Sequence, residues 1–141
     1  MNANLHKRGS CLCGAVKFSI NLKHPAFGAC HCSMCRKWGG GPLLTVDSDA
    51  PAQYSQGEDQ IRTFSSSEWA ERGFCATCGS HLFYRLKQGG FYAVPVGLIE
   101  EADDLTFGLQ VFIDEKPASY CFSNQTETMT GQQVAEMFDQ T

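Results

Sequence analysis

Apolar and polar residues alternate over several short stretches of this chain, which is the pattern of half-buried β-strands. The clearest stretch is 15–22, where every second position is apolar: Val16, Phe18, Ile20 and Leu22. The same reasoning predicts further strands at 43–46, 61–64, 82–86, 91–96 and 109–113. Pro95 indicates that its strand ends there or lies at a sheet edge, because proline lacks the N–H that a sheet ladder needs. The predicted fold class is mostly β.

Helical spacing is confined to the C-terminal tail. Val134, Met137 and Phe138 have this spacing over about 132–138, and Thr130 stands in the position of a cap. Gly89-Gly90 is predicted to form a hairpin turn between two of the strands. With 141 residues and no linker or repeat, the chain fits one domain, 1–141.

Cysteines carry the candidate chemistry. Seven of the eight lie in three tight groups, which are Cys11 with Cys13, then Cys30, Cys32 and Cys35, then Cys75 with Cys78. Four disulfides would also use eight cysteines, but Cys-x-Cys neighbours are poorly placed to bridge each other and nothing in the sequence suggests export. The spacing therefore favours metal binding.

The seven grouped thiols divide into four and three. A Cys-x-Cys pair and a distant Cys-x-x-Cys-Gly knuckle make a closed four-thiolate zinc site, which stabilises a fold without offering a position for chemistry. The middle group of three leaves zinc one ligand short, and three protein ligands with an open fourth position are typical of catalytic zinc. A soft, all-sulfur site suits an incoming thiol as the fourth ligand.

Several alternatives stay open at this point. Cys121, His81 or His31 could close the second site and make it structural. Cys75 and Cys78 could be a redox pair, although the βαβ setting of such pairs is missing. Iron could take the place of zinc in the four-thiolate site, because sulfur spacing does not separate the two metals.

Charged residues narrow the range of partners. Arg36 and Lys37, followed by Gly39 and Gly40, could hold carboxylates of a small anionic ligand, although a solvated turn explains them equally well. The 11 Lys and Arg against 15 Asp and Glu give a net charge of -4, which excludes a general positive field for nucleic acid or anionic membranes. Since no apolar run resembles a signal peptide or a membrane span, we expect a cytoplasmic protein.

Three motifs together resemble the glutathione-dependent formaldehyde-activating (GFA) family, also called the CENP-V/GFA domain. They are Gly9–Val16, Cys30–Lys37 and Arg72–Ser80 with Leu82–Tyr84. The resemblance runs from about residue 9 to residue 120, which would make 9–120 the core of the domain and 121–141 a tail. It implies an Mss4-like fold, a complex and largely antiparallel β structure built around zinc.

The resemblance also implies an activity, the joining of glutathione to formaldehyde, which is classed as a carbon-sulfur lyase reaction in the reverse direction. A structural zinc would be held by Cys11, Cys13, Cys75 and Cys78, and a second, catalytic zinc by Cys30, Cys32 and Cys35. Arg36, Lys37 and the glycine amides would hold the carboxylates of glutathione. The alternative function is a zinc-stabilised protein-interaction module, because Mss4-like folds also serve in that role.

Overall fold

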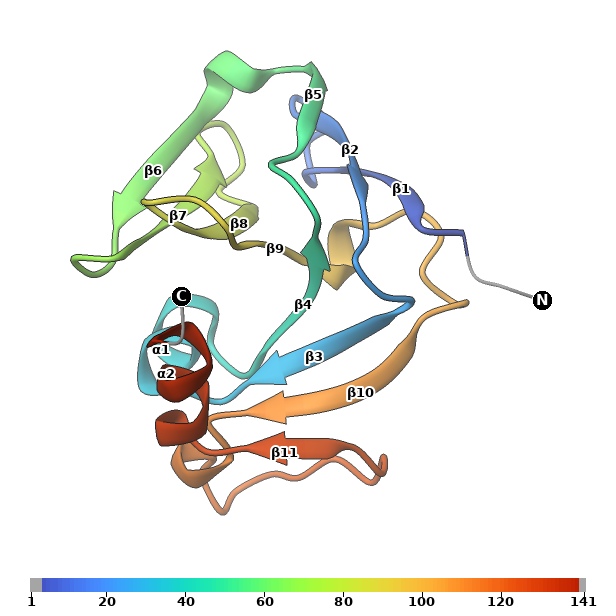
Figure 1. Cartoon of the computed structure of the whole chain (residues 1–141). Coiled ribbons are helices and arrows are strands. Elements are labelled where there is room, and N and C mark those ends of the chain that lie inside the picture. The colour runs from blue at the N-terminus through green and yellow to red at the C-terminus, as the bar shows by residue number, and fades with distance from the viewer. Residues whose placement is uncertain (1–3, 140–141) are drawn as a thin grey trace.

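The computed structural model describes residues 4–139 and contains two sheets (Figure 1). The smaller sheet has the strand order β1 (His6–Ser10), β2 (Lys17–Asn21) and β5 (Gln53–Gln56). The larger has the order β11 (Glu127–Met129), β10 (Thr106–Val111), β3 (Ala26–Cys30), β4 (Leu43–Ser48), β9 (Tyr92–Pro95), β8 (His81–Leu86), β7 (Ala70–Cys75) and β6 (Ile61–Ser65). Neighbouring strands are antiparallel except where β10 pairs with β3 and with β11. The predicted mostly β fold is confirmed.

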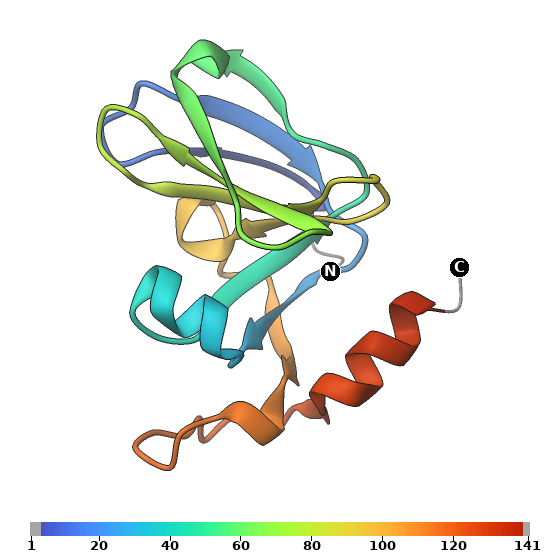
Figure 2. The same cartoon turned by 90° about the vertical axis from the view of Figure 1, so that its left-hand side faces the viewer.

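Two α-helices and three short 3-10 helices are the other regular elements of residues 4–139. They are α1 (Ser33–Gly39), α2 (Gly131–Asp139), η1 (Glu58–Gln60), η2 (Val96–Leu98) and η3 (Ile113–Glu115). The helices overlap in Figure 1, but the view turned by 90° shows them well apart (Figure 2). Among residues 4–139, no helix has the length and apolar character needed to cross a membrane.

The core lies where the smaller sheet covers the central strands of the larger one. The alternation predicted for 15–22 is confirmed, since Val16, Phe18, Ile20 and Leu22 are all buried. They pack in one cluster with residues of β4, β8 and β9, which are Val46, Leu82, Phe83, Tyr92 and Val94. The period-2 pattern therefore identified the core face of β2 correctly.

The other predicted strands are found as β4, β6, β8, β9 and β10, with boundaries that shift by one to three residues. Gly89 and Gly90 form the turn between β8 and β9, and both have φ of 89°, a conformation that glycine adopts without strain. Pro95 ends β9, and β9 lies inside the sheet between β4 and β8. Of the two expectations for Pro95, the strand end is the one that holds.

The predicted tail helix is α2, and a capping box starts it. The Thr130 hydroxyl accepts a hydrogen bond from the backbone N–H of Gln133 at 3.2 Å. The Gln133 side-chain oxygen accepts one from the backbone N–H of Thr130 at 2.8 Å. The expectation that only the tail is helical is wrong, because α1 carries the second half of the middle cysteine group. At seven residues this helix is too short to show a periodic pattern.

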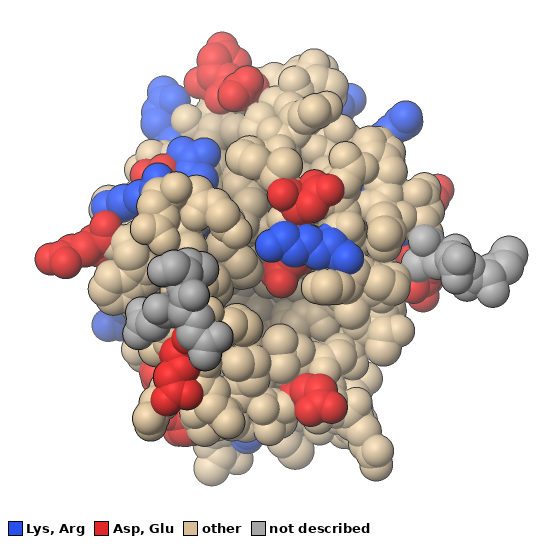
Figure 3. Space-filling model, in the orientation of Figure 1, with Lys and Arg blue, Asp and Glu red and all other residues tan. Residues whose placement is uncertain are grey.

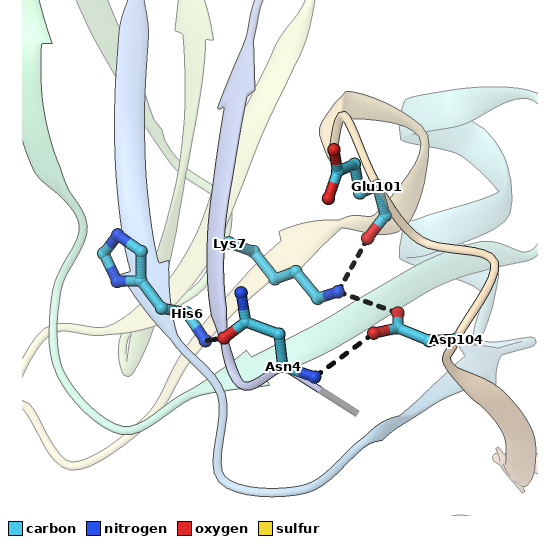
Figure 4. A network of polar contacts seen from close by, with 5 residues as sticks. All are labelled: Asn4, His6, Lys7, Glu101 and Asp104. Atoms are coloured by element: carbon cyan, nitrogen blue, oxygen red, sulfur yellow. Dashed lines mark hydrogen bonds and ion pairs between the residues drawn. The ribbon is translucent and has the colours of Figure 1, made fainter. Parts of the chain in front are cut away.

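A buried lysine fixes the first strand (Figure 4). The Lys7 side chain is only 3% exposed, and its ammonium donates to the Glu101 carbonyl and to the Asp104 carboxylate, each at 2.7 Å. The backbone N–H of Asn4 donates to the other oxygen of the Asp104 carboxylate at 3.2 Å. These bonds hold β1 against the segment that follows η2, and β1 leads directly into the first cysteine pair.

Candidate metal centres

The first and last cysteine pairs meet in one cluster. Cys11 and Cys13 follow β1, Cys75 ends β7 and Cys78 lies in the next turn, and their four sulfurs are all within 4.8 Å of one another. The Cys11 and Cys13 sulfurs are 3.6 Å apart, and those of Cys13 and Cys75 are 3.9 Å apart. Tetrahedral zinc with bonds of about 2.3 Å places its sulfur ligands about 3.8 Å apart. The donor set and spacing therefore fit a four-thiolate metal ion.

Two tight turns, each ending in a glycine, build this cluster. The Gly14 amide donates to the Cys11 carbonyl at 3.1 Å and the Gly79 amide to the Cys75 carbonyl at 2.8 Å. Both glycines have φ near 80°, which a residue with a side chain rarely adopts. Hydrogen bonding from Ser80 lowers the pKa of Cys78 to about 5, which favours the thiolate that a metal needs.

The middle group forms a second, separate cluster at the junction of β3 and α1. Cys30 ends β3, Cys32 caps α1 and Cys35 lies in its first turn, with their three sulfurs within 4.8 Å of one another. The Cys32 sulfur accepts from the Cys35 amide at 3.3 Å. Hydrogen bonds from the Cys30 and Cys35 thiols lower the pKa of Cys32 to about 2, and the same sharing raises the pKa of Cys30. All three can be thiolates together only beside a cation.

The second cluster contains three sulfurs and lacks a fourth ligand from the part of the chain that the structure describes. Among these residues, no other Cys, His, Asp or Glu ligand atom lies within 4.8 Å of all three sulfurs. Cys121 is exposed and belongs to neither cluster. His31 is fully buried, and its two ring nitrogens contact the Tyr120 hydroxyl and the Gln110 side-chain oxygen, each at 2.8 Å. His81 stacks on Trp38, with ring centroids 4.5 Å apart.

Arg72 of β7 lies against this cluster, and the sequence reasoning missed it. Its side chain is 2% exposed, and both terminal nitrogens are 3.6 Å from the Cys35 sulfur. Its guanidinium carbon stands 5.0 Å from the centre of the Tyr84 ring. Arg72 is on the buried side of its strand with Ala70, so an alternation analysis of residues 70–75 could have predicted its burial, although not its contact with Cys35.

The four residues expected to bind substrate surround the C-terminal half of α1. Arg36 is half-buried and donates from Nε to the His31 carbonyl at 2.9 Å, whereas Lys37 is exposed. Gly39 belongs to the helix, and Gly40 caps it by donating to the Arg36 carbonyl at 2.8 Å. The Gly40 amide is thus already bonded, which leaves the cations as the main anion-binding groups here.

A shallow surface depression lies beside the four-cysteine cluster. It has a volume of about 370 Å³ and is lined by Gly79, Ser80, His81, Pro95, Gly97 and Leu98. Gly79 and Ser80 belong to the knuckle of the four-cysteine cluster, while His81 leads to α1 through its stacking on Trp38. Burial and the nearby charge of Arg72 lower the pKa of His81, which favours a neutral imidazole.

On the face shown in Figure 3, basic and acidic side chains are interspersed.

Comparison with known proteins agrees with this arrangement. A sequence profile described as glutathione-dependent formaldehyde-activating enzyme matches residues 6–115. The chain belongs to this family. It is 33% identical over 127 residues to an uncharacterised lyase of Schizosaccharomyces pombe, covering 89% of this chain and 92% of the relative.

Two further likenesses are weaker. A protein of Halomonas elongata, named as a candidate glutathione-dependent formaldehyde-activating enzyme, is 36% identical over 83 residues, which is 53% of each chain. A crystal structure of a Rhodobacter sphaeroides protein matches with a TM-score of 0.59 at 22% identity, over 71% of this chain and 98% of that one. The structural match supports the fold alone.

Proposed function

We propose that this GFA-family protein is a zinc-dependent enzyme that joins a thiol such as glutathione to a small aldehyde such as formaldehyde, or splits the adduct. The observation that carries the proposal is a three-sulfur cluster with no fourth ligand from the described residues, in a fold that also contains a complete four-sulfur cluster. The lyase name of one relative and the glutathione-dependent name of another support the reaction class.

The two clusters would have different roles. Cys11, Cys13, Cys75 and Cys78 would hold a structural zinc, and Cys30, Cys32 and Cys35 a second zinc with room for one external ligand. Zinc bound to the three cysteines would lower the pKa of an incoming thiol and keep it as a thiolate. The described residues supply no competing fourth ligand that this thiol would have to displace.

The chain would then position and protonate the reactants. Arg36 and Lys37 would attract carboxylates of the thiol substrate to the end of α1, and the depression beside His81 would receive the rest of it. A new carbon-sulfur bond forms at the aldehyde carbon while the carbonyl π pair moves to oxygen. That oxygen takes up the proton which the thiol lost, so the product is a hydroxymethyl thioether.

His81 is the titratable side chain that borders the depression, and we propose that it carries this proton. Its lowered pKa keeps it neutral at pH 7, so it could accept a proton from the thiol and return it to the alkoxide. His31 is a poorer donor, because it is fully buried and both of its nitrogens already have partners.

Magnetisation-exchange NMR of formaldehyde with glutathione tests the proposal. Zinc-loaded wild-type protein should speed the exchange between free glutathione and its hydroxymethyl adduct. The Cys32→Ser variant should not, whereas Cys121→Ser, which changes a thiol outside both clusters, should act like the wild type. If wild-type protein and buffer give the same exchange rate, glutathione-formaldehyde chemistry is wrong for this chain.

A further inference from the structure

We propose that Arg72 is a positioning residue of the three-cysteine site. Its guanidinium supplies the positive charge that allows three thiolates to stand together, and its N–H groups restrain the Cys35 sulfur so that an aldehyde reacts with the bound substrate thiol instead. The second part of this inference rests on the proposed function, while the first part requires only that the cluster binds a metal.

Arg72 is a buried cation that has no carboxylate partner among the described residues. Two ion pairs are present among the described residues, Lys7 with Asp104 and Arg85 with Glu71, and Arg72 is in neither. Its Nε has no hydrogen-bond partner in the described part of the chain, so its polar contacts go to the Cys35 sulfur. Burying an uncompensated charge is very unfavourable. The anion that compensates Arg72 is therefore the thiolate cluster.

The neighbouring strands hold the Arg72 guanidinium in place. Arg72 lies on β7, opposite Phe64 of β6 and Tyr84 of β8. The Tyr84 ring stacks beneath the guanidinium at 5.0 Å, an arrangement that favours a cation. With paired strands on both sides and 2% exposure, the side chain has no route to solvent and remains against Cys35.

The two clusters would differ in net charge once each binds a divalent metal. Three thiolates with a divalent metal carry one net negative charge, which Arg72 balances. Four thiolates with the same metal carry two, but there Cys13 is exposed to water and Ser80 hydrogen-bonds Cys78. In the three-cysteine cluster Cys35 is buried, and it is this sulfur that Arg72 touches.

The contact with Arg72 would also change the reactivity of the Cys35 sulfur. Hydrogen bonds to a thiolate withdraw electron density, so Cys35 becomes a weaker nucleophile. A substrate sulfur without such hydrogen bonds stays the more reactive of the two, and addition of the aldehyde to Cys35, which would block the site, is suppressed.

Cobalt(II)-loaded variants test this placement without any substrate. Arg72→Met removes the charge at similar length and should shift the sulfur-to-cobalt charge-transfer band of the second site to longer wavelength. A chelator should then remove that metal at least tenfold faster, and Arg72→Lys should restore part of its retention. Arg85→Met is the matched control, since Arg85 lies over the Phe83 ring and pairs with Glu71.

A second readout follows alkylation of the zinc-loaded protein by iodoacetamide with mass spectrometry. Cys35 should be modified several-fold faster in Arg72→Met than in the wild type, and Arg85→Met should show no change. A folded Arg72→Met protein with wild-type metal retention, charge-transfer band and alkylation rate would overturn the proposal. None of these readouts uses formaldehyde or glutathione, so failure here is distinct from failure of the proposed reaction.

Should Arg72→Met not fold, a double variant decides. Cys35→Ser removes the sulfur that faces Arg72 and leaves the cation without its anion. The Cys35→Ser/Arg72→Met protein should then be more stable to urea than Cys35→Ser alone. If the double variant is instead less stable, Arg72 has another structural role and the proposal is wrong.

Discussion

The two cysteine clusters use the same ligand chemistry in opposite settings. The four-cysteine cluster joins positions about sixty residues apart and ties the β1–β2 turn to the β7–β8 turn, so it connects the two sheets. The three-cysteine cluster spans six residues at one strand-helix junction and lies against a buried arginine. The number of sulfur ligands alone therefore does not assign a role to a cluster. What each cluster connects, and what balances its charge, is more informative.

Breaking one ligand in each cluster should have the largest and most unequal effects. Cys78→Ser removes a link between distant segments and should reduce the free energy of unfolding by about 4 kcal/mol or more. Cys32→Ser opens only a short local loop and should reduce it by about 1–2 kcal/mol while losing one metal. Urea denaturation and metal analysis measure both. Equal losses of stability would show that the second cluster is structural too.

Substitution of His31, which lies between Cys30 and Cys32 in the chain, should have the next largest effect. His31→Leu leaves the Gln110 oxygen and the Tyr120 hydroxyl without their buried partner, and we expect a loss of about 2 kcal/mol. Metal retention should fall at the three-cysteine cluster and stay unchanged at the other. His24→Leu, at an exposed position, should change stability by less than about 0.5 kcal/mol. Equal effects of the two substitutions would contradict the network.

A matched pair of glycines sharpens the comparison. Gly79 and Gly40 both have positive φ and open space where the methyl group of an alanine would lie, so alanine adds backbone strain without a clash. Each alanine variant should lose about 1 kcal/mol. Gly79→Ala should loosen the metal of the four-cysteine cluster and Gly40→Ala that of the other, as chelator competition can measure. Loss of the same metal in both variants would contradict separate sites.

The smallest effect concerns the Lys7 anchor of β1. A hydrogen bond from Lys7 lowers the pKa of Asp104, so its contribution to stability is complete above the unfolded pKa near 3.8 and is lost as the pH falls through the still lower folded value. Asp104→Asn should lower the Tm by an amount that stays constant from pH 6 to pH 8. Thermal melts at several pH values check this, and a difference that varies across that range would contradict the assignment.

Much of the fold could be predicted, and the failures have physical reasons. The apolar alternation of β2 was clear in the sequence, but the buried positions of β1 are Lys7 and Gly9, whose burial depends on distant partners. Trp69 is aromatic and yet 59% exposed, so an aromatic side chain does not by itself define burial. Short elements such as α1 have too few residues for a periodic signal.

The site shows the same division between local and distant information. Cysteine spacing predicted both groups of thiols that the structure brings together. The contact between Arg72 and Cys35 joins residues 37 positions apart, so no local pattern could reveal it. Whether Cys121, His31 or His81 approached the second cluster also depended on long-range packing.

The central claim is that one cluster is closed and the other accepts an external thiol. The most direct measurement is a titration of the cobalt(II)-loaded protein with glutathione, followed by the sulfur-to-cobalt charge-transfer absorption. The account predicts a saturable increase in the wild type, from one added sulfur ligand at the second site, and none in Cys32→Ser. A wild-type spectrum that glutathione leaves unchanged, or an equal increase in Cys32→Ser, would contradict it.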